Sequence, residues 1–196
     1  MKTFAPILAA LAALVLSACY PPTTMHPVGT TIGIKNDPLL DGTWKAEPEP
    51  DSTSGKFYYY HFLTAKNESI LAVLVPSAGA ANDVMLFRLT TARFGKFGIM
   101  NARLEAGPES DDSEQPPGSV PVLYRVDAKG KLTLYLLDED ATKEAIRAGR
   151  IAGDAGKAGT DDAVISADAP TLDKFFQSRT GQGLFKKPFA VLTKVN

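Results

Sequence analysis

Between residues 42 and 137 the chain places short runs of β-branched and aromatic residues between turn residues. Alternation of apolar and polar positions in such runs is typical of strands that are buried on one face. Eight or nine strands are predicted in all: Gly42–Ala46, Lys56–Thr64, Glu68–Val75, Val84–Phe94, Phe97–Glu105, Val120–Asp127, Lys131–Leu137, a short Ala163–Ser166 and Phe189–Val195. The first seven follow one another without a helix, which favours an antiparallel barrel or sandwich.

Two helices interrupt this pattern late in the chain. Asp140 is placed to cap a helix over residues 141–148 that Gly149 ends, and Asp168 is placed to cap a helix over residues 169–178. The second helix is expected to bury three apolar side chains, Leu172, Phe175 and Phe176. The predicted fold is therefore mainly β, an antiparallel barrel of about eight strands with two short helices near the C-terminus.

A hairpin at Gly95-Lys96 fixes how two of the strands face each other. A loop of two residues with glycine first suits a type II′ turn, which sets Phe94 opposite Phe97 and Arg88 opposite Arg103. One face of the hairpin is then apolar and the other is polar. The apolar face holds Phe87, Leu89, Met100, Ala102 and Leu104, and the polar face holds Arg88, Thr90, Asn101 and Arg103.

A second hairpin turns through Ala128-Lys129-Gly130, where Gly130 suits the left-handed position of a three-residue loop. Asp127 then faces Lys131. The core face of this hairpin is expected to hold Tyr124, Val126, Leu132, Leu134 and Leu136. Both hairpins thus have one buried side and one solvated side, as the wall of a barrel requires.

The first nineteen residues carry a different signal. Lys2 precedes an apolar run over residues 4–16, which as a helix is about 20 Å long and too short for a membrane core of about 30 Å. Such a run before small residues indicates a secretory signal peptide. Leu16-Ser17-Ala18-Cys19 resembles the lipobox of bacterial lipoproteins, which implies cleavage after Ala18 and acylation of Cys19 by a diacylglycerol and an N-linked chain such as palmitate. The alternative is a plain secretory signal that happens to contain a cysteine.

The lipobox resemblance divides the chain into a signal peptide at 1–18, a lipidated tether at 19–36 and a barrel domain at 37–196. The tether is expected because residues 20–36 carry three prolines and no apolar period. Three acyl chains exceed the two signals that stable anchoring needs. Tyr20 stands where an aspartate would hold an enterobacterial lipoprotein at the inner membrane, so the resemblance implies an outer-membrane protein that faces the periplasm.

Asp41-Gly42-Thr43-Trp44 opens the first expected strand and resembles the Gly-x-Trp signature of lipocalins. In that family the tryptophan closes one end of an eight-stranded barrel, and a basic residue from the last strand packs over the indole. Lys194 is the candidate by position. Two helices before the last strand depart from the single helix that follows a lipocalin barrel. The pattern as a whole resembles uncharacterised lipocalin-like lipoproteins of Gram-negative bacteria, a group that implies no assigned activity.

Composition excludes several classes of function. The formal net charge of −1 gives no electrostatic basis for nucleic-acid binding. A single cysteine and two histidines rule out an intramolecular disulfide and a Cys/His metal cluster. His26 lies in the expected tether and His61 in a strand, so we expect neither a metal site nor a nucleophile–base pair. The sequence therefore predicts no enzyme and no cofactor.

Two pairs of residues are candidate sites. Tyr58 and Tyr60 lie on one face of a strand, where they would line a cavity for a small apolar ligand or simply pack in the core. Arg88 and Arg103 place like charges opposite each other, which is unfavourable unless something neutralises them. They would dock an anion or an envelope partner, or be balanced by acids from Glu105 onward. Trp44 is expected to fill the core rather than to contact a ligand.

Two functions from different classes follow from these sites. The first is a hollow barrel that binds a small apolar ligand, which predicts a cavity open at one end. The alternative is a solid barrel that docks an envelope protein or polymer through its outer face, which predicts a filled interior and an exposed basic or apolar patch. Small barrels occur in both forms, so the fold alone does not choose between them.

Overall fold

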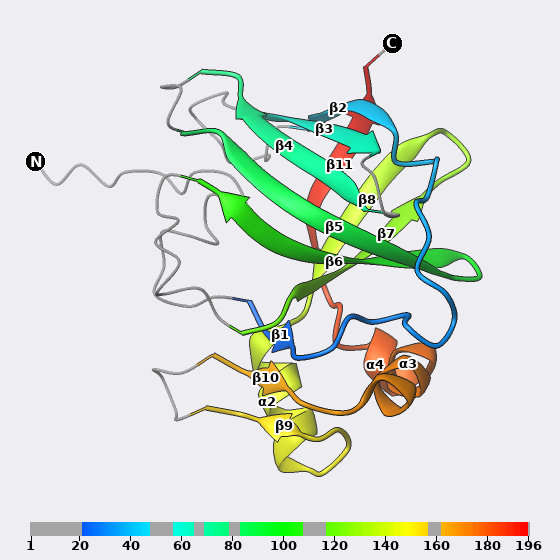
Figure 1. The fold of residues 1–196 in the computed structure, drawn as a ribbon, viewed down its shortest axis with the longest axis vertical. Helices are drawn as coiled ribbons and strands as arrows, with labels where there is room; N and C mark the ends of the chain where they lie inside the picture. The colour runs from blue at the N-terminus through cyan, green and yellow to red at the C-terminus, as the bar shows by residue number, and fades with distance from the viewer. Residues whose placement is uncertain are drawn as a thin grey trace, which may run out of the picture.

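Eight strands close into an antiparallel barrel in the order β11-β2-β3-β4-β5-β6-β7-β8 (Figure 1). The computed structural model describes residues 21–47, 57–64, 69–78, 83–107, 117–156 and 162–195. The barrel strands are β2 (Gly42–Ala46), β3 (Tyr58–Thr64), β4 (Ile70–Pro76), β5 (Met85–Phe94), β6 (Phe97–Ala106), β7 (Val120–Val126), β8 (Lys131–Leu136) and β11 (Pro188–Lys194). The prediction of a mainly-β antiparallel barrel of about eight strands is confirmed.

The other described elements lie outside the barrel wall, below it in Figure 1. They are β1 (Thr23–Thr24), β9 (Gly153–Asp154), β10 (Val164–Ile165), α2 (Glu139–Arg147), α3 (Ala169–Gln177) and α4 (Arg179–Gln182). The three short strands form a separate sheet in the order β1-β10-β9. The short strand expected near residues 163–166 therefore exists, but it pairs outside the barrel.

The helix starts follow local hydrogen bonding. Asp168 caps α3 as expected, since its carboxylate accepts a hydrogen bond of 2.9 Å from the Thr171 amide. Helix α2 begins earlier than predicted, because Asp138 rather than Asp140 accepts the capping bond, from the Ala141 amide at 2.9 Å. The same Asp138 oxygen binds Lys186 Nζ at 2.9 Å. That distant contact favours Asp138 as the cap and is not visible in the local sequence.

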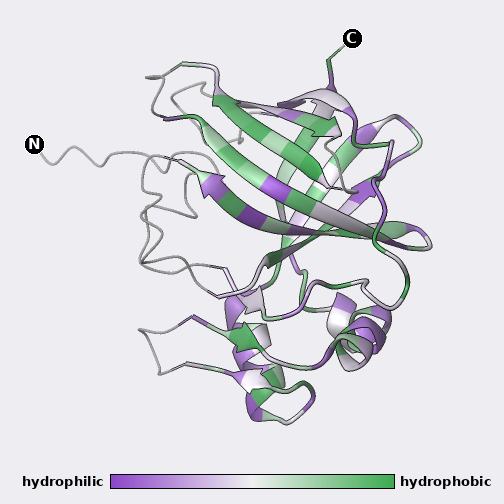
Figure 2. Cartoon of the chain, viewed as in Figure 1, coloured by the Kyte–Doolittle hydropathy of each residue, from purple (hydrophilic) through white to green (hydrophobic). Residues whose placement is uncertain are grey.

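Both predicted hairpins have the expected register. Arg88 lies opposite Arg103 and Phe94 opposite Phe97, and Gly95 has a φ of +68°. In the second hairpin the amide of Asp127 donates to the carbonyl of Lys131 at 2.9 Å. Strand alternation then sends the apolar faces inward, as the bands of alternating hydropathy along the barrel strands show (Figure 2).

Two hydrophobic cores share the barrel wall. The inner core fills the barrel and includes Trp44, Tyr60, Phe62, Ile70, Leu74, Tyr124 and Leu132. The outer core lies between the wall and the helices and includes Val28, Ile99, Leu123, Ile165, Leu172 and Phe176. The strands β6 and β7 are therefore buried on both faces over part of their length, with Ile99 and Leu123 on the outer side.

Residues 21–36, expected to be a tether, instead pack along the outside of the wall, and we call them the strap. Strand β1 of the strap pairs in parallel with β10. Val28 is fully buried; its amide donates to Asn101 Oδ1 at 2.7 Å, and Asn101 Nδ2 donates to its carbonyl at 3.0 Å. The prediction of a solvated polar face is thus wrong at Asn101. The strap is held mainly by polar contacts with distant residues. Because such contacts leave no periodic pattern of apolar residues, the sequence of this segment resembled a flexible tether.

Asp173 of α3 fastens the middle of the strap. Asp173 is only 1% exposed. It accepts hydrogen bonds from the Gly29 amide at 2.5 Å, from the Thr31 amide at 2.8 Å and from Thr31 Oγ1 at 2.6 Å. One buried carboxylate therefore satisfies three donors that lie about 140 residues away in sequence.

We predict that Asp173→Ala loosens the strap. The substitution leaves buried amides without an acceptor, so the free energy of unfolding should fall by about 2–4 kcal/mol. Hydrogen exchange at the Gly29 and Thr31 amides should accelerate. Asp140→Ala, which removes an exposed acid from α2, is the matched control and should change neither quantity. Unchanged exchange at both amides in Asp173→Ala would show that the carboxylate does not hold the strap.

Candidate functional site

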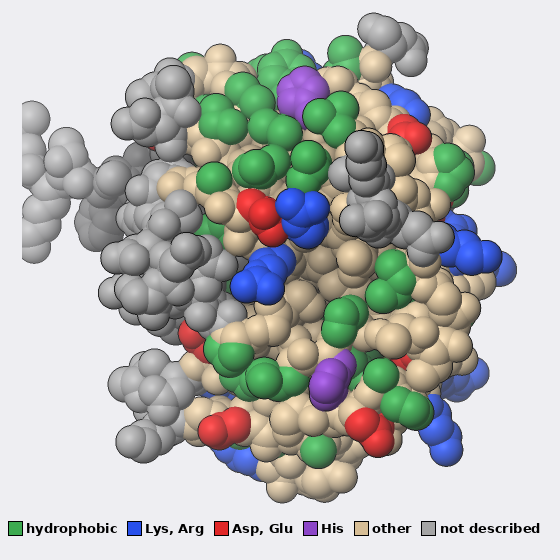
Figure 3. Space-filling view, viewed as in Figure 1, with side chains coloured by type: hydrophobic (Ala, Val, Ile, Leu, Met, Phe, Trp, Pro, Cys, Tyr) green, Lys and Arg blue, Asp and Glu red, His purple; other side chains and the backbone are tan. Residues whose placement is uncertain are grey.

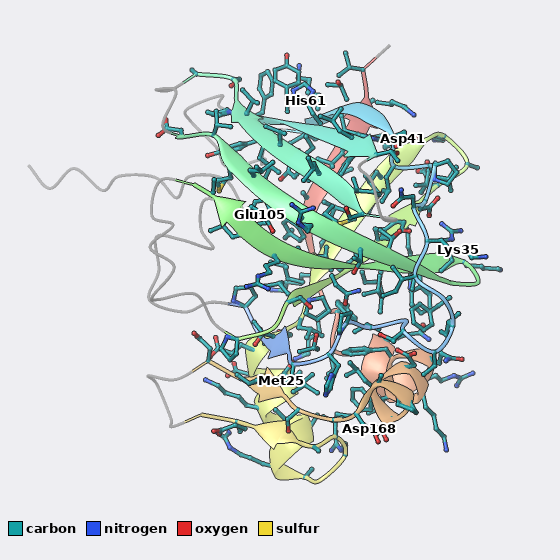
Figure 4. The ribbon with its side chains drawn as sticks, viewed as in Figure 1. Met25, Lys35, Asp41, His61, Glu105 and Asp168 are labelled. Atoms are coloured by element: carbon teal, nitrogen blue, oxygen red, sulfur yellow. The ribbon has the colours of Figure 1, made fainter. Side chains whose placement is uncertain are left out.

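The chain crosses and closes one end of the barrel between Lys35 and Asp41, directly after the strap. The amide of Lys35 donates to the carbonyl of Thr91, near the end of β5, at 2.9 Å. Leu40 is fully buried, and its carbonyl accepts a hydrogen bond of 2.7 Å from the indole nitrogen of Trp44. Figure 4 follows this path through the labelled residues Met25, Lys35 and Asp41.

Trp44 and Lys194 complete the closed end. Trp44 belongs to the inner core, and β11 places Lys194 opposite it in the adjacent strand. The ammonium group of Lys194 lies 5.3 Å from the centroid of the indole ring, within reach of a cation–π interaction. Both expectations, that Trp44 packs in the core and that Lys194 covers it, are confirmed.

Asp37 adds a polar contact at the same end that the sequence did not indicate. Its Oδ2 accepts hydrogen bonds from the Tyr124 hydroxyl at 2.6 Å and from Arg93 Nη1 at 3.1 Å. Burial, together with the neighbouring Asp37 carboxylate, raises the pKa of Tyr124 far above its usual range. Asp37 lies outside every predicted strand, so strand patterning alone does not point to it.

Beyond this closed end the barrel encloses an apolar cavity of about 90 Å³. Residues from seven of the barrel strands line it, among them Tyr60, Phe62, Leu74, Phe87, Met100 and Leu134. Further residues line it from the strap, from the turn before β7 and from β6, and we call Pro21, Thr23, Gly118, Ser119 and Arg103 the cavity rim. Side chains of the inner core therefore fill most of the barrel and leave one small cavity.

The two candidate tyrosines take different places in this interior. Tyr60 lines the cavity, and its ring lies 6.4 Å from that of Phe62. Burial raises the pKa of the Tyr60 hydroxyl well above its usual range. Tyr58 is buried in the same core, where burial and Asp83 raise its pKa, but it is not among the residues that line the cavity. The geometry therefore brings only Tyr60 to the candidate site.

The cavity rim contains polar atoms that lack partners. Thr23 is 1% exposed, and neither its hydroxyl nor that of Ser119 has a hydrogen-bond partner in the described part of the chain. The backbones of Thr24 and Ser119 are bridged by two hydrogen bonds, of 2.9 and 3.0 Å. No local pattern in the sequence points to Thr23 or Ser119, since the contact that joins their segments, between Thr24 and Ser119, spans 95 residues.

Arg88 and Arg103 lie opposite each other on β5 and β6, where both are exposed on the outer face. Arg88 binds Glu105 through two contacts, Nε to Oε1 at 3.0 Å and Nη2 to Oε2 at 3.2 Å. This contact lowers the pKa of the Glu105 carboxyl. The alternative that a nearby acid balances the pair therefore holds: Glu105 pairs with Arg88, and the charge of the exposed Arg103 also contributes to lowering the pKa of Glu105. The other acids considered, at 109–114, lie outside the described residues.

Other chemistry is sparse within the described residues. They contain no group of three or more His, Cys, Asp or Glu placed to hold a metal ion. His61 lies on the outer face of β3, with Nδ1 2.9 Å from Thr43 Oγ1. No described helix is long and apolar enough to cross a bilayer. The expected cleavage and lipidation site at Ala18 and Cys19 lies outside the described residues.

Comparison of the chain with models of protein families, with curated proteins and with solved structures finds no match.

We predict that Tyr60 and Tyr124 ionise only as the protein unfolds. Because their pKa values are raised in the folded state, their contribution to stability is complete below the ordinary tyrosine pKa of about 10 and is lost as the pH rises above it. Phenolate absorbance should therefore show a late step that coincides with the loss of β-sheet circular dichroism. A double variant, Tyr60→Phe with Tyr124→Phe, should lose that step. A step of undiminished amplitude in the double variant would contradict the assignment.

Proposed function

We propose that this protein is a lipid-anchored protein of the bacterial envelope that binds a small apolar ligand inside its barrel and catalyses no reaction. The cavity beside Tyr60 carries this proposal. Its walls are almost entirely apolar, so water inside finds few hydrogen-bond partners, and an apolar group that displaces this water gains roughly 25 cal/mol for each Å² removed from solvent.

The size of the cavity limits the ligand. Its volume of about 90 Å³ compares with about 30 Å³ for one molecule of liquid water. It also falls below the roughly 300 Å³ at which pockets for drug-sized molecules begin. The apolar part of the ligand is therefore short, such as a segment of an acyl chain. A whole two-chain phospholipid does not fit.

The position of the cavity rim supports a role at the membrane surface. Pro21 lines the cavity, and Cys19 precedes it by two residues, which span at most about 7 Å. Acylation of Cys19 after cleavage behind Ala18 would therefore hold the cavity rim close to the bilayer rather than on a long tether. We propose the outer membrane, with the barrel facing the periplasm.

A second candidate function is docking of an envelope protein through the outer wall. The outward residues of β3, β4 and β5 form an apolar face: Tyr59, Leu63, Leu71, Val73, Val75 and Leu86. Leu63 is 52% exposed, and Figure 3 shows hydrophobic side chains gathered on this part of the surface. Patches of this kind often mark interaction sites. The two functions predict different outcomes in the experiment below.

We predict that full-length protein carrying Cys19→Ala, exported to the periplasm and purified without detergent, binds a small apolar molecule. Native mass spectrometry should show an added mass that extraction with organic solvent removes. Ala72 lines the cavity, so Ala72→Leu should fill it and abolish the added mass, with the free energy of unfolding lowered by no more than about 1–3 kcal/mol. Ala128→Leu makes the same change in an exposed turn and should keep the added mass.

The result that overturns ligand binding is a bare mass that fatty acids and lipids added afterwards do not change. In that case the outer face of β3, β4 and β5 becomes the favoured site, and Val73→Lys on that face should weaken association with an envelope partner. An added mass that persists in Ala72→Leu would place the ligand elsewhere and would also contradict the proposal.

The anchor is tested separately in cells. Cys19→Ala should move the protein from the membrane fraction to the soluble periplasmic fraction, because its acyl chains supply the membrane affinity. Globomycin, which blocks lipoprotein signal cleavage, should cause the unprocessed wild-type protein to accumulate. Unchanged membrane partition of Cys19→Ala would show that the cysteine is not the anchor.

A further inference from the structure

We infer that the outer face of β3, β4 and β5 lies on the surface of a bilayer that contains anionic phospholipid. The outward residues that form this face are Tyr59, Leu63, Leu71, Val73, Val75 and Leu86. The inference rests on the lipid anchor of the proposed function, because the anchor brings the barrel to the membrane. It goes further in stating which side of the barrel the membrane meets.

The outer face is continuous across the three strands. Leu63 of β3 lies opposite Leu71 of β4. Val73 of β4 lies opposite Leu86 of β5. Leu63 is 52% exposed, and the outward side chains of β4 are half-buried. The described helices lie below the wall, away from these strands (Figure 1), so they leave this face open to solvent.

Basic side chains border the apolar part of this face. Lys45, Arg88 and Arg103 all lie on the outer side of the wall. Strands β2–β6 contain one acidic residue, Glu105, which pairs with Arg88 and lies in the field of Arg103. No salt bridge among the described residues involves Lys45, whose ammonium group lies 4.3 Å from the Phe57 ring centroid. The face therefore carries an excess of positive charge on a chain whose formal net charge is −1.

The strap begins beside the basic border. Strand β6 pairs with β7 as far as Ala102, and Ser119, directly before β7, pairs with Thr24 of the strap. Arg103 follows Ala102 and therefore lies two strand spacings, about 10 Å, from Thr24. Cys19 precedes Thr24 by five residues, which span at most about 18 Å. Acyl chains on Cys19 would thus enter the bilayer close to this border.

A bilayer fits this face better than a second copy of the chain does. Anionic headgroups attract the basic border, and the acyl region accepts the apolar side chains. A second copy would oppose one positive face to another, with Glu105 as the only acid that strands β2–β6 offer. Tyr59 adds an apolar ring with a polar hydroxyl, a kind of side chain that is enriched at membrane interfaces. An envelope protein, the alternative occupant of this face, is an outcome of the test.

The test measures vesicle binding without the anchor. Residues 19–196 carrying Cys19→Ala keep every described residue and lack the signal peptide and the acyl chains. They are sedimented with vesicles of phosphatidylcholine alone, or of phosphatidylcholine and phosphatidylglycerol in equal parts. The chain should bind the anionic vesicles more tightly, and salt should weaken this binding because it screens exposed charges. The face supplements the anchor, so this affinity should be too weak to retain Cys19→Ala at the membrane in cells.

Two variants test the charged and the apolar parts of the face. Arg103→Gln should weaken binding to the anionic vesicles about fivefold, as expected for one basic residue near such a surface, and leave neutral vesicles unaffected. Leu63→Gln should weaken binding to both kinds of vesicle several-fold, because it removes exposed apolar surface.

Matched controls lie elsewhere on the surface. Arg125→Gln removes an equal charge from an exposed position on β7. Ile32→Gln removes an apolar side chain from the strap, where Ile32 is 43% exposed. Neither control should change vesicle binding, and none of the four variants should lower the melting temperature.

The outcomes are distinguishable. Absence of binding to anionic vesicles would overturn the inference, and so would a control that weakens binding as much as its test variant. If no vesicle binds but an envelope protein crosslinked to this face is released by Leu63→Gln, the face docks a protein instead. A missing added mass in native mass spectrometry would contradict the proposed ligand, and unchanged membrane partition of Cys19→Ala in cells would contradict the proposed anchor. Neither of those results decides whether the face binds vesicles.

Discussion

The attachment of the strap to the barrel is the constraint on which the described architecture depends. Asp173 accepts hydrogen bonds from the backbone amides of Gly29 and Thr31. The side chain of Asn101 bonds both the amide and the carbonyl of Val28. N-terminal to these contacts, the strap contributes Pro21 and Thr23 to the cavity rim. C-terminal to them, it leads into the segment that closes the other end of the barrel. A free tether would leave the outer core without Val28 and the cavity without Pro21 and Thr23. Buried polar contacts therefore set both ends of the barrel.

The two ends are built by different means, and the difference has functional consequences. At the closed end the Trp44 indole binds the Leu40 carbonyl, and Asp37 binds Tyr124 and Arg93, although the buried Asn36 Oδ1 has no partner in the described structure. At the cavity rim two hydroxyls have none in the described structure. The bonded groups make the closed end rigid, and the apolar lining of the cavity suits an apolar ligand.

The sequence predicted what is local and missed what is distant. Alternation of side chains gave the barrel strands to within a few residues, and the Gly95 turn gave the pairing of Arg88 with Arg103, because each follows from neighbouring residues. The strap, the Asp138 cap and the Asp37 contacts depend on partners 48 to 144 residues away. They are polar, so they leave no hydrophobic pattern. Of the candidate site residues, Tyr60 lines the cavity and Tyr58 does not. The arginine pair is exposed on the outer face beside Glu105, and no sequence pattern pointed to Thr23 or Ser119.

The most direct test of the account is where a bound amphiphile lies. Isotope-edited nuclear Overhauser measurements on the full chain carrying Cys19→Ala, with octanoate added, would show this without any further variant. A ligand inside the barrel should give contacts from the octanoate chain to the methyl groups of Met100 and Leu134, which line the cavity. Contacts confined to Leu71 and Val73 on the outer wall would contradict this expectation and would show that the barrel interior is not the binding site.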